Sequence, residues 1–141
     1  MQNDPPLPAG RQTRGKPMIL LVTAKVSPRE LEELCAAHYE TMVKFVADIE
    51  KEILAAGGEL HADAEALLLA QGSRQSDLWG GNFYPWKAPD QRVEFTSFVN
   101  IRPADGNASM EVKNPVIRGK IVGLVEKLLL APGEEISGEK K

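Results

Sequence analysis

Several features are scarce or missing in this chain of 141 residues, and each absence excludes a class of protein. A single cysteine, Cys35, leaves no partner for an intramolecular disulfide and too few thiolates for a cysteine-based zinc site. Its position among apolar residues predicts a free buried thiol. No apolar run reaches the roughly 18 to 20 residues of a membrane span, and the N-terminus lacks the apolar core of a signal peptide. We therefore expect a soluble, cytoplasmic protein without a membrane partner.

Positive charge is not in surplus either. The 17 Lys and Arg residues against 20 Asp and Glu residues give a net charge of -3, whereas nucleic-acid binders usually carry excess Lys and Arg. Nucleic acid is therefore not an expected partner. The glycine-rich dinucleotide loop, the P-loop, the nucleophile elbow and the H-E-x-x-H pair are absent too. These absences favour a binding protein over an enzyme, although they do not exclude catalysis. The sequence identifies no metal site and no cofactor.

The composition that remains, 43% hydrophobic, is typical of one globular domain. We predict that this domain spans residues 18–130. Residues 1–17 are rich in proline, glycine and polar residues, so we expect a disordered segment, and we expect the same of the tail over residues 131–141.

Two long helices are expected around a short sheet. Ser27-Pro28 with Glu30 predicts a helix start, and apolar residues at three- and four-residue steps continue to a glycine stop at residues 57–58. Asn114-Pro115 predicts the start of the second helix. Its apolar surface is broad, so this helix either packs deeply or forms a homodimer contact.

The strands expected between and before these helices are short. Residues 18–26 form an apolar run, and the alternation over residues 93–102 is the clearest strand pattern in the chain. Gly80-Gly81, within the aromatic run over residues 77–86, indicates a bulge or a close approach of another backbone or a ligand. The fold class predicted is α+β, with three or four mostly antiparallel strands and the two long helices on one face.

His61, Asp63 and Asp77 are candidates for acid–base catalysis. In a short strand, His61 and Asp63 point to one face and form an acid–base or metal-binding pair. The alternative is that Asp63 is only the N-cap of a short helix.

Arg102 precedes a turn of small polar residues with a free glycine, which is a plausible cradle for a carboxylate or phosphate. The alternative is that Arg102 binds no ligand, pairs with Glu59, Asp63 or Asp77 across the sheet and only fixes the strand register. Tyr84 and Trp86 are expected near a rim, where aromatic side chains stack a ligand or a partner. The alternative, mainly for Trp79 and Phe83, is that these rings fill the core. The candidate ligand-binding residues are Trp79, Asn82, Tyr84, Asn100, Arg102, Asn107 and Ser109.

The segments GELHADAEALLLAQGS, DLWGGNFYP and VEFTSFVNIRPADGNAS, followed by a Val/Ile/Leu helix, resemble a family of small bacterial and archaeal proteins described only as a domain of unknown function. The resemblance covers about residues 26–130. It implies no activity or substrate. The recurring polar residues of the family correspond here to His61, Asp63, Gln75, Asp77, Asn82, Asn100, Arg102, Asn107 and Ser109.

Two functions are compatible with these observations. In the first, the polar groups converge in one pocket that binds or hydrolyses a small anionic metabolite, with Arg102 on the anion and His61 as acid or base. In the second, the same groups are structural. The protein is then a regulatory or toxin–antitoxin-like partner that acts through the aromatic rim over residues 84–86 and the last helix.

Overall fold

The computed structural model describes residues 18–136, which form one antiparallel sheet and three α-helices. The strands are β1 (Ile19–Val22), β2 (Val43–Asp48), β3 (Ile53–Gly57), β4 (Leu78–Phe83) and β5 (Val93–Glu94). The helices are α1 (Pro28–His38), α2 (His61–Ala70) and α3 (Pro115–Leu128). The strand order is β1-β3-β2-β4-β5, and every neighbouring pair is antiparallel. The α+β class is therefore confirmed, with five strands instead of three or four. The segment 1–17 and the end of the tail, residues 137–141, lie outside the described residues.

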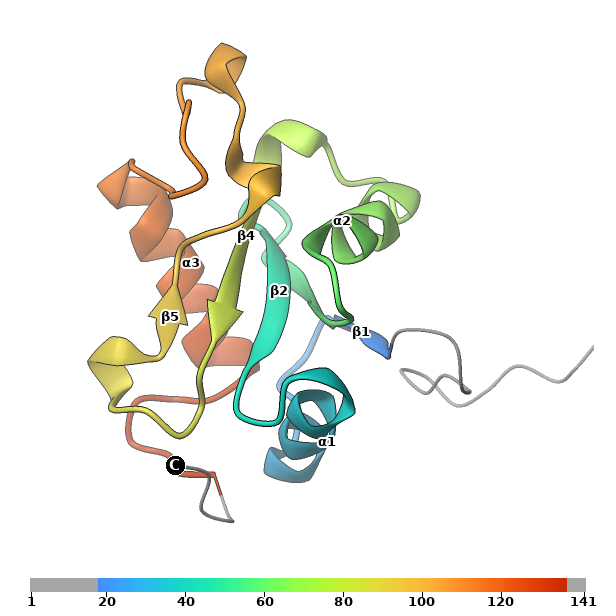
Figure 1. Cartoon of the computed structure of the whole chain (residues 1–141), viewed down its shortest axis with the longest axis vertical. Coiled ribbons are helices and arrows are strands. Elements are labelled where there is room, and N and C mark those ends of the chain that lie inside the picture. Colours follow the sequence, from blue (N-terminus) through green and yellow to red (C-terminus); the bar gives the residue numbers. More distant parts are fainter. Residues whose placement is uncertain (1–17, 137–141) are drawn as a thin grey trace, which may run out of the picture.

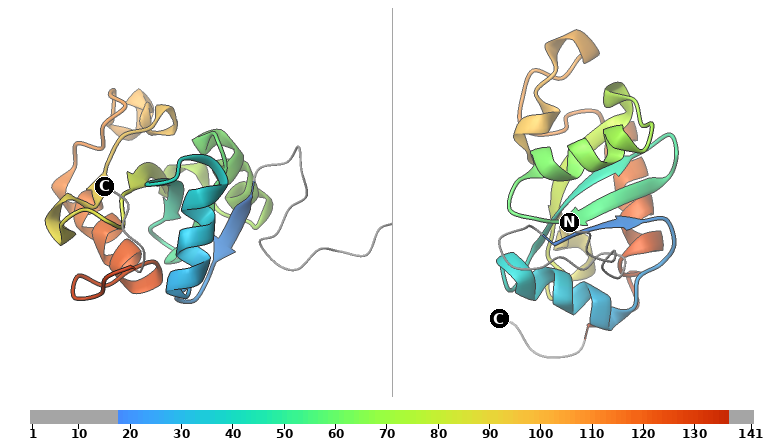
Figure 2. Two further views of the ribbon diagram at one scale, coloured as in Figure 1. Left: turned by 60° about the horizontal axis from the view of Figure 1, so that its bottom comes forward. Right: turned by 90° about the vertical axis from the view of Figure 1, so that its right-hand side faces the viewer.

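The sheet separates two hydrophobic clusters, because alternate side chains of each strand point to opposite faces. α1 and α3 pack on one face, against Phe45, Leu54 and Phe83. α2 packs on the other face, where its Leu68 joins Val46 of β2. Figures 1 and 2 show this arrangement, with the sheet between α2 and the other two helices. The two helices that correspond to the predicted long ones, α1 and α3, thus share one face as expected, and the shorter α2 covers the other.

Both predicted helix starts are confirmed. Ser27 and Glu30 form a reciprocal capping box at α1, and the Asn114 side chain accepts hydrogen bonds from two backbone N–H groups at the start of α3. Part of the apolar surface of α3 is buried within the same chain, since Ile121 and Val125 have no exposed surface. Val116 is 65% exposed and Val122 is partly exposed, so the homodimer contact stays a prediction.

The predicted single helix over residues 27–57 is wrong. α1 ends at His38, and the chain continues as a hairpin of β2 and β3. These central strands are buried on both faces, so they read as nearly continuous apolar runs, which fit a helical period as well as a strand. The turns carry no glycine or proline signal. Glu40 and Glu52 adopt left-handed φ values of 65° and 60° there instead.

The predicted strand over residues 93–102 is also too long. Only Val93–Glu94 is a strand, and Thr96 keeps an isolated bridge to Glu111. The Ser97 hydroxyl accepts a hydrogen bond from the Val99 N–H and begins a 3₁₀ turn. A local bond between a side chain and the backbone thus ends the strand that the alternation predicted.

Gly80 and Gly81 form no bulge, because β4 pairs with β2 residue for residue. Close approach accounts for them instead. A Cβ atom on Gly80 would lie 2.8 Å from the Ser97 Cβ, and one on Gly81 would lie 2.7 Å from the Glu94 carbonyl oxygen. Gly81 also leaves room for the ring of Phe45, directly across the sheet.

Residues 131–136, which the sequence assigned to a loose tail, lie against the core. The buried guanidinium of Arg92 donates hydrogen bonds to the carbonyl oxygens of Ala131 and Glu134, and Ile136 is buried. The packed chain therefore extends to Ile136.

Candidate functional site

A row of three polar side chains crosses the sheet on the face that α2 covers. Lys44 of β2 lies opposite Asn82 of β4, and Asn82 lies opposite Glu94 of β5. Since these residues share a register position, their side chains project to the same face of the sheet. Asn82 is nearly buried, Lys44 is half-buried and Glu94 is exposed, so the row runs from the interior to solvent.

His61, the first residue of α2, reaches over this row. Its Nε2 lies 2.7 Å from the carbonyl oxygen of Gly81. A carbonyl only accepts, so Nε2 carries the proton, and Nδ1 of the neutral ring is left as an acceptor. Burial lowers the pKa of His61, and the Lys44 ammonium lowers it further, whereas the hydrogen bond to Gly81 acts in the opposite direction. His61 is therefore neutral near pH 7.

Lys44 is the cation of this cluster. Among the residues that the structure describes, no carboxylate or hydrogen-bond acceptor lies within bonding distance of its ammonium group. Its nearest aromatic group is Tyr39, with the ring centroid 5.2 Å from Nζ. Burial lowers the pKa of Lys44, although Glu94 acts to raise it. Lys44 is thus a partly desolvated ammonium group that contacts the Tyr39 ring but has no ion-pair or hydrogen-bond partner among the described residues.

Hydrogen-bond acceptors lie at the other end of the row, around Glu94. Glu94 Oε1 accepts hydrogen bonds from Asn82 Nδ2 at 2.7 Å and from the Tyr84 hydroxyl at 3.2 Å. Burial and the nearby Glu94 carboxylate raise the pKa of Tyr84, so its hydroxyl stays protonated. Asn82 Oδ1 is buried and has no hydrogen-bond partner within residues 18–136. We call Lys44, His61, Asn82, Tyr84 and Glu94 the α2-face cluster.

The start of α2 adds partial positive charge to this cluster. Leu60 occupies the N-cap position, and no side chain caps the helix. The first N–H groups of a helix have no intrahelical acceptor, and the helix dipole makes this end attractive to anions. The α2-face cluster therefore combines an unpaired ammonium and a helix N-terminus with the acceptors around Glu94.

Trp79 and Arg102 form a second group on the opposite face of the sheet. The Arg102 guanidinium stacks 4.2 Å from the Trp79 ring centroid. It donates to the Asp105 carboxylate and to the Val99 carbonyl oxygen. Arg102 Nη2 and Trp79 Nε1 are buried without partners among the described residues. Arg102 therefore pairs with none of the three acidic residues that the sequence offered as partners.

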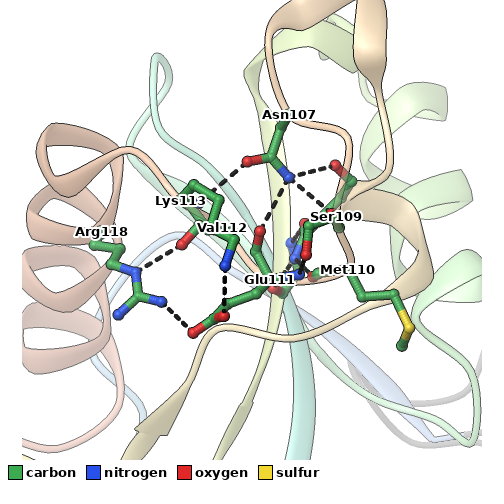
Figure 3. Close-up of polar contacts among 9 residues, drawn as sticks. Asn107, Ser109, Met110, Glu111, Val112, Lys113 and Arg118 are labelled. Atoms are coloured by element: carbon green, nitrogen blue, oxygen red, sulfur yellow. Dashed lines mark hydrogen bonds and ion pairs between the residues drawn. The ribbon is translucent and has the colours of Figure 1, made fainter.

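Asn100 and Asn107 hold the long segment between β5 and α3 in place. Asn100 exchanges hydrogen bonds with the backbone N–H and carbonyl of Gly80, as a neighbouring strand would. Asn107 Nδ2 lies within hydrogen-bond distance of three carbonyl oxygens, and its Oδ1 accepts from the Lys113 N–H (Figure 3). The Ser109 hydroxyl accepts from the Glu111 N–H. These three side chains bond to the backbone of the segment and position it.

The two acidic candidates lie apart from His61. Asp63 belongs to α2, where a two-residue step places side chains on different sides of the helix, and it is not the N-cap. Asp77 pairs with Arg74. Neither carboxylate contacts His61, so the acid–base pair expected from the sequence does not form. Within residues 18–136, no group of three or more His, Cys, Asp or Glu side chains is placed to hold a metal ion.

Sequence reasoning missed two members of the α2-face cluster. Lys44 falls within the long helix predicted up to residues 57–58, and Glu94 falls within the strand predicted over residues 93–102, and neither was a candidate site residue. Their proximity depends on the pairing of β2, β4 and β5, which no local pattern reveals. His61, Asn82 and Tyr84 were identified and do come together, whereas Trp79 and Arg102 lie on the other face.

Comparison with known proteins gives one match. Residues 20–128 match the model of a family described as "Protein of unknown function (DUF5674)". No curated protein matches, and no solved structure matches. The match covers most of the chain, and the resemblance noted in the sequence is confirmed. No helix within the described residues is long and apolar enough to span a membrane.

Proposed function

We propose that this protein, which belongs to the DUF5674 family, binds a small molecule that carries a carboxylate or phosphate. The proposal is drawn from the site itself, because the family is described as one of unknown function. The single observation behind this proposal is the half-buried Lys44 ammonium, which lies near the uncapped start of α2. Apart from the Tyr39 ring, it has no ion-pair or hydrogen-bond partner among residues 18–136. A buried charge without a partner is costly, and a bound anion would remove that cost.

The other members of the α2-face cluster define the rest of the ligand. The Glu94 carboxylate and Asn82 Oδ1 are acceptors, so they favour a ligand with a hydroxyl or amino group next to its anionic group. Tyr84 forms an aromatic wall beside them, with Lys87 Nζ 4.1 Å from its ring centroid. Hydroxy acids and phosphorylated polyols have this combination of groups.

Binding alone accounts for the cluster better than catalysis does. His61 is oriented by a backbone carbonyl, but no nucleophile or second acid–base group contacts it within the described residues. We therefore assign His61 to ligand recognition, as an acceptor through Nδ1.

Titration with inorganic phosphate, glycerol 3-phosphate and lactate, followed by amide NMR, tests this function. We expect saturable shifts at Lys44, His61 and Asn82, with glycerol 3-phosphate bound more tightly than phosphate. A charge-assisted hydrogen bond contributes about 1.5–3 kcal/mol, so Lys44→Met should weaken binding about 10- to 100-fold. Lys120→Met, which removes an exposed ammonium on α3, is the matched control and should leave binding unchanged. Absence of saturable shifts, or equal binding by Lys44→Met, contradicts the proposal.

A second candidate function is a protein interaction, and one observation favours it. Phe98 is 76% exposed and Leu60 is 60% exposed, on a turn and a loop that adjoin α2. The rim over residues 84–86, by contrast, is less exposed, because Pro85 is buried and Tyr84 and Trp86 are partly buried. If the interaction hypothesis is correct, Phe98→Ser should abolish partner binding without affecting the affinity for glycerol 3-phosphate.

A further inference from the structure

A second site lies on the other face of the sheet, between β5, α3 and the C-terminal segment. It is a cleft of about 210 Å³. Its walls are mainly apolar side chains, among them Phe83, Phe95, Val122 and Leu130. Phe83 and Leu130 belong to the core and form a fixed floor, while Phe95 and Val122 are partly exposed. Figure 1 shows β5 beside α3, and these two elements contribute Val93, Val122 and Val125 to the lining.

The charged groups of this cleft differ in whether they are free to contact a ligand. Arg92 is buried, and its guanidinium donates to the carbonyl oxygens of Lys87, Ala131 and Glu134. These bonds engage three of its five N–H groups with the protein backbone. Asp90 and Glu126 also line the cleft, and neither has a salt bridge or hydrogen bond among the described residues. The Arg92 guanidinium keeps its charge but is buried, so the charged side chains that solvent reaches at the cleft are the acidic ones.

We propose that this cleft binds a small organic cation with an apolar body, such as an arylalkylamine. The apolar walls take up the body, whose burial provides most of the binding free energy. The ammonium group lies at the mouth, between Asp90 and Glu126. The volume is smaller than that of typical drug-sized pockets and suits one aromatic ring with a short chain. This site shares no residue with the α2-face cluster, so it does not depend on the function proposed above.

Three ligands of similar shape and different charge test the proposal: phenethylamine, 2-phenylethanol and phenylacetate. Binding is followed by the methyl NMR signals of Val93, Val122 and Leu130. We expect saturable shifts with phenethylamine, weaker binding of the alcohol and the weakest binding of the acid. Because exposed ion pairs contribute up to about 1 kcal/mol, Asp90→Asn combined with Glu126→Gln should weaken phenethylamine binding about fivefold.

The controls separate cleft binding from nonspecific charge effects. Asp63→Asn removes an exposed carboxylate on α2 and should leave phenethylamine binding unchanged. Val122→Trp fills the cleft from its partly exposed side and should abolish binding while thermal unfolding shows an intact fold. The proposal is overturned if phenethylamine shifts none of these methyl signals, or if phenylacetate binds as tightly as phenethylamine.

Discussion

Replacing Asn107 with alanine should destabilise the protein strongly, because this side chain holds together the segment between β5 and α3. Asn107 is 4% exposed. Its Nδ2 lies 2.9 Å from the Asn100 carbonyl oxygen, 2.8 Å from that of Ser109 and 3.1 Å from that of Glu111. Two N–H bonds serve these three acceptors, and Oδ1 accepts a further bond from the Lys113 N–H. Alanine thus removes about three hydrogen bonds.

At about 1 kcal/mol for each bond, the free energy of unfolding should fall by about 3 kcal/mol. The Asn100 carbonyl is buried, so water cannot easily replace its lost donor. The loss is a large share of the roughly 5–15 kcal/mol that stabilises a domain. Urea denaturation measures it, and hydrogen exchange should show faster exchange over residues 97–113.

Two variants show whether the hydrogen bonds are responsible. Asn107→Asp keeps the acceptor but places a carboxylate against carbonyl oxygens, so it should be at least as destabilising as alanine. Asn114→Ala removes the exposed N-cap of α3 and should cost only about 1 kcal/mol. If Asn107→Ala costs no more than Asn114→Ala, the account of this segment is refuted.

Three further predictions concern other parts of the molecule. The buried Ser73 hydroxyl donates to Asp48 Oδ2 at 2.6 Å, so Ser73→Ala should lower the free energy of unfolding by about 1–3 kcal/mol in urea denaturation. The folded-state pKa of His61 lies below 6.5, so the unfolded chain binds more protons between that pKa and 6.5. Stability should therefore fall as the pH decreases through this window and level off below the folded-state pKa, and His61→Gln should reduce that slope in denaturation curves measured across it. Arg102→Ala should uncover the ring of Trp79, which a shift of its indole N–H signal in NMR would report; an unchanged signal would contradict the stacking.

The parts of the fold that were predicted correctly are those whose ends carry chemical signals. Ser27 and Glu30 cap α1 through bonds between residues three positions apart, and Asn114 with Pro115 begins α3 in the same local way. Such signals are independent of the rest of the chain. The hairpin of β2 and β3 was missed because the turn before it and the turn within it use left-handed Glu40 and Glu52. In addition, burial on both faces removes the alternation that identifies a strand.

The candidate site shows the same limit. His61, Asn82 and Tyr84 were candidates in the sequence because of their residue types, whereas their partners Lys44 and Glu94 were not. Lys44 and Glu94 join them only through strand register, which is a property of the folded sheet. Asn100 and Asn107 were predicted to bind a ligand, since a buried amide that clamps the backbone and one that contacts a ligand have the same residue type. The structure gives both of them backbone partners.

The most direct test of the α2-face cluster as an anion site is the pKa of Lys44, measured by NMR of its side chain with and without glycerol 3-phosphate. In the free protein, burial should hold this pKa below 10.5. A bound anion favours the charged form, so the pKa of Lys44 should rise on binding, and that of His61 should rise with it. If glycerol 3-phosphate leaves both pKa values unchanged at saturating concentration, the anion is not bound at Lys44 and the central claim is wrong.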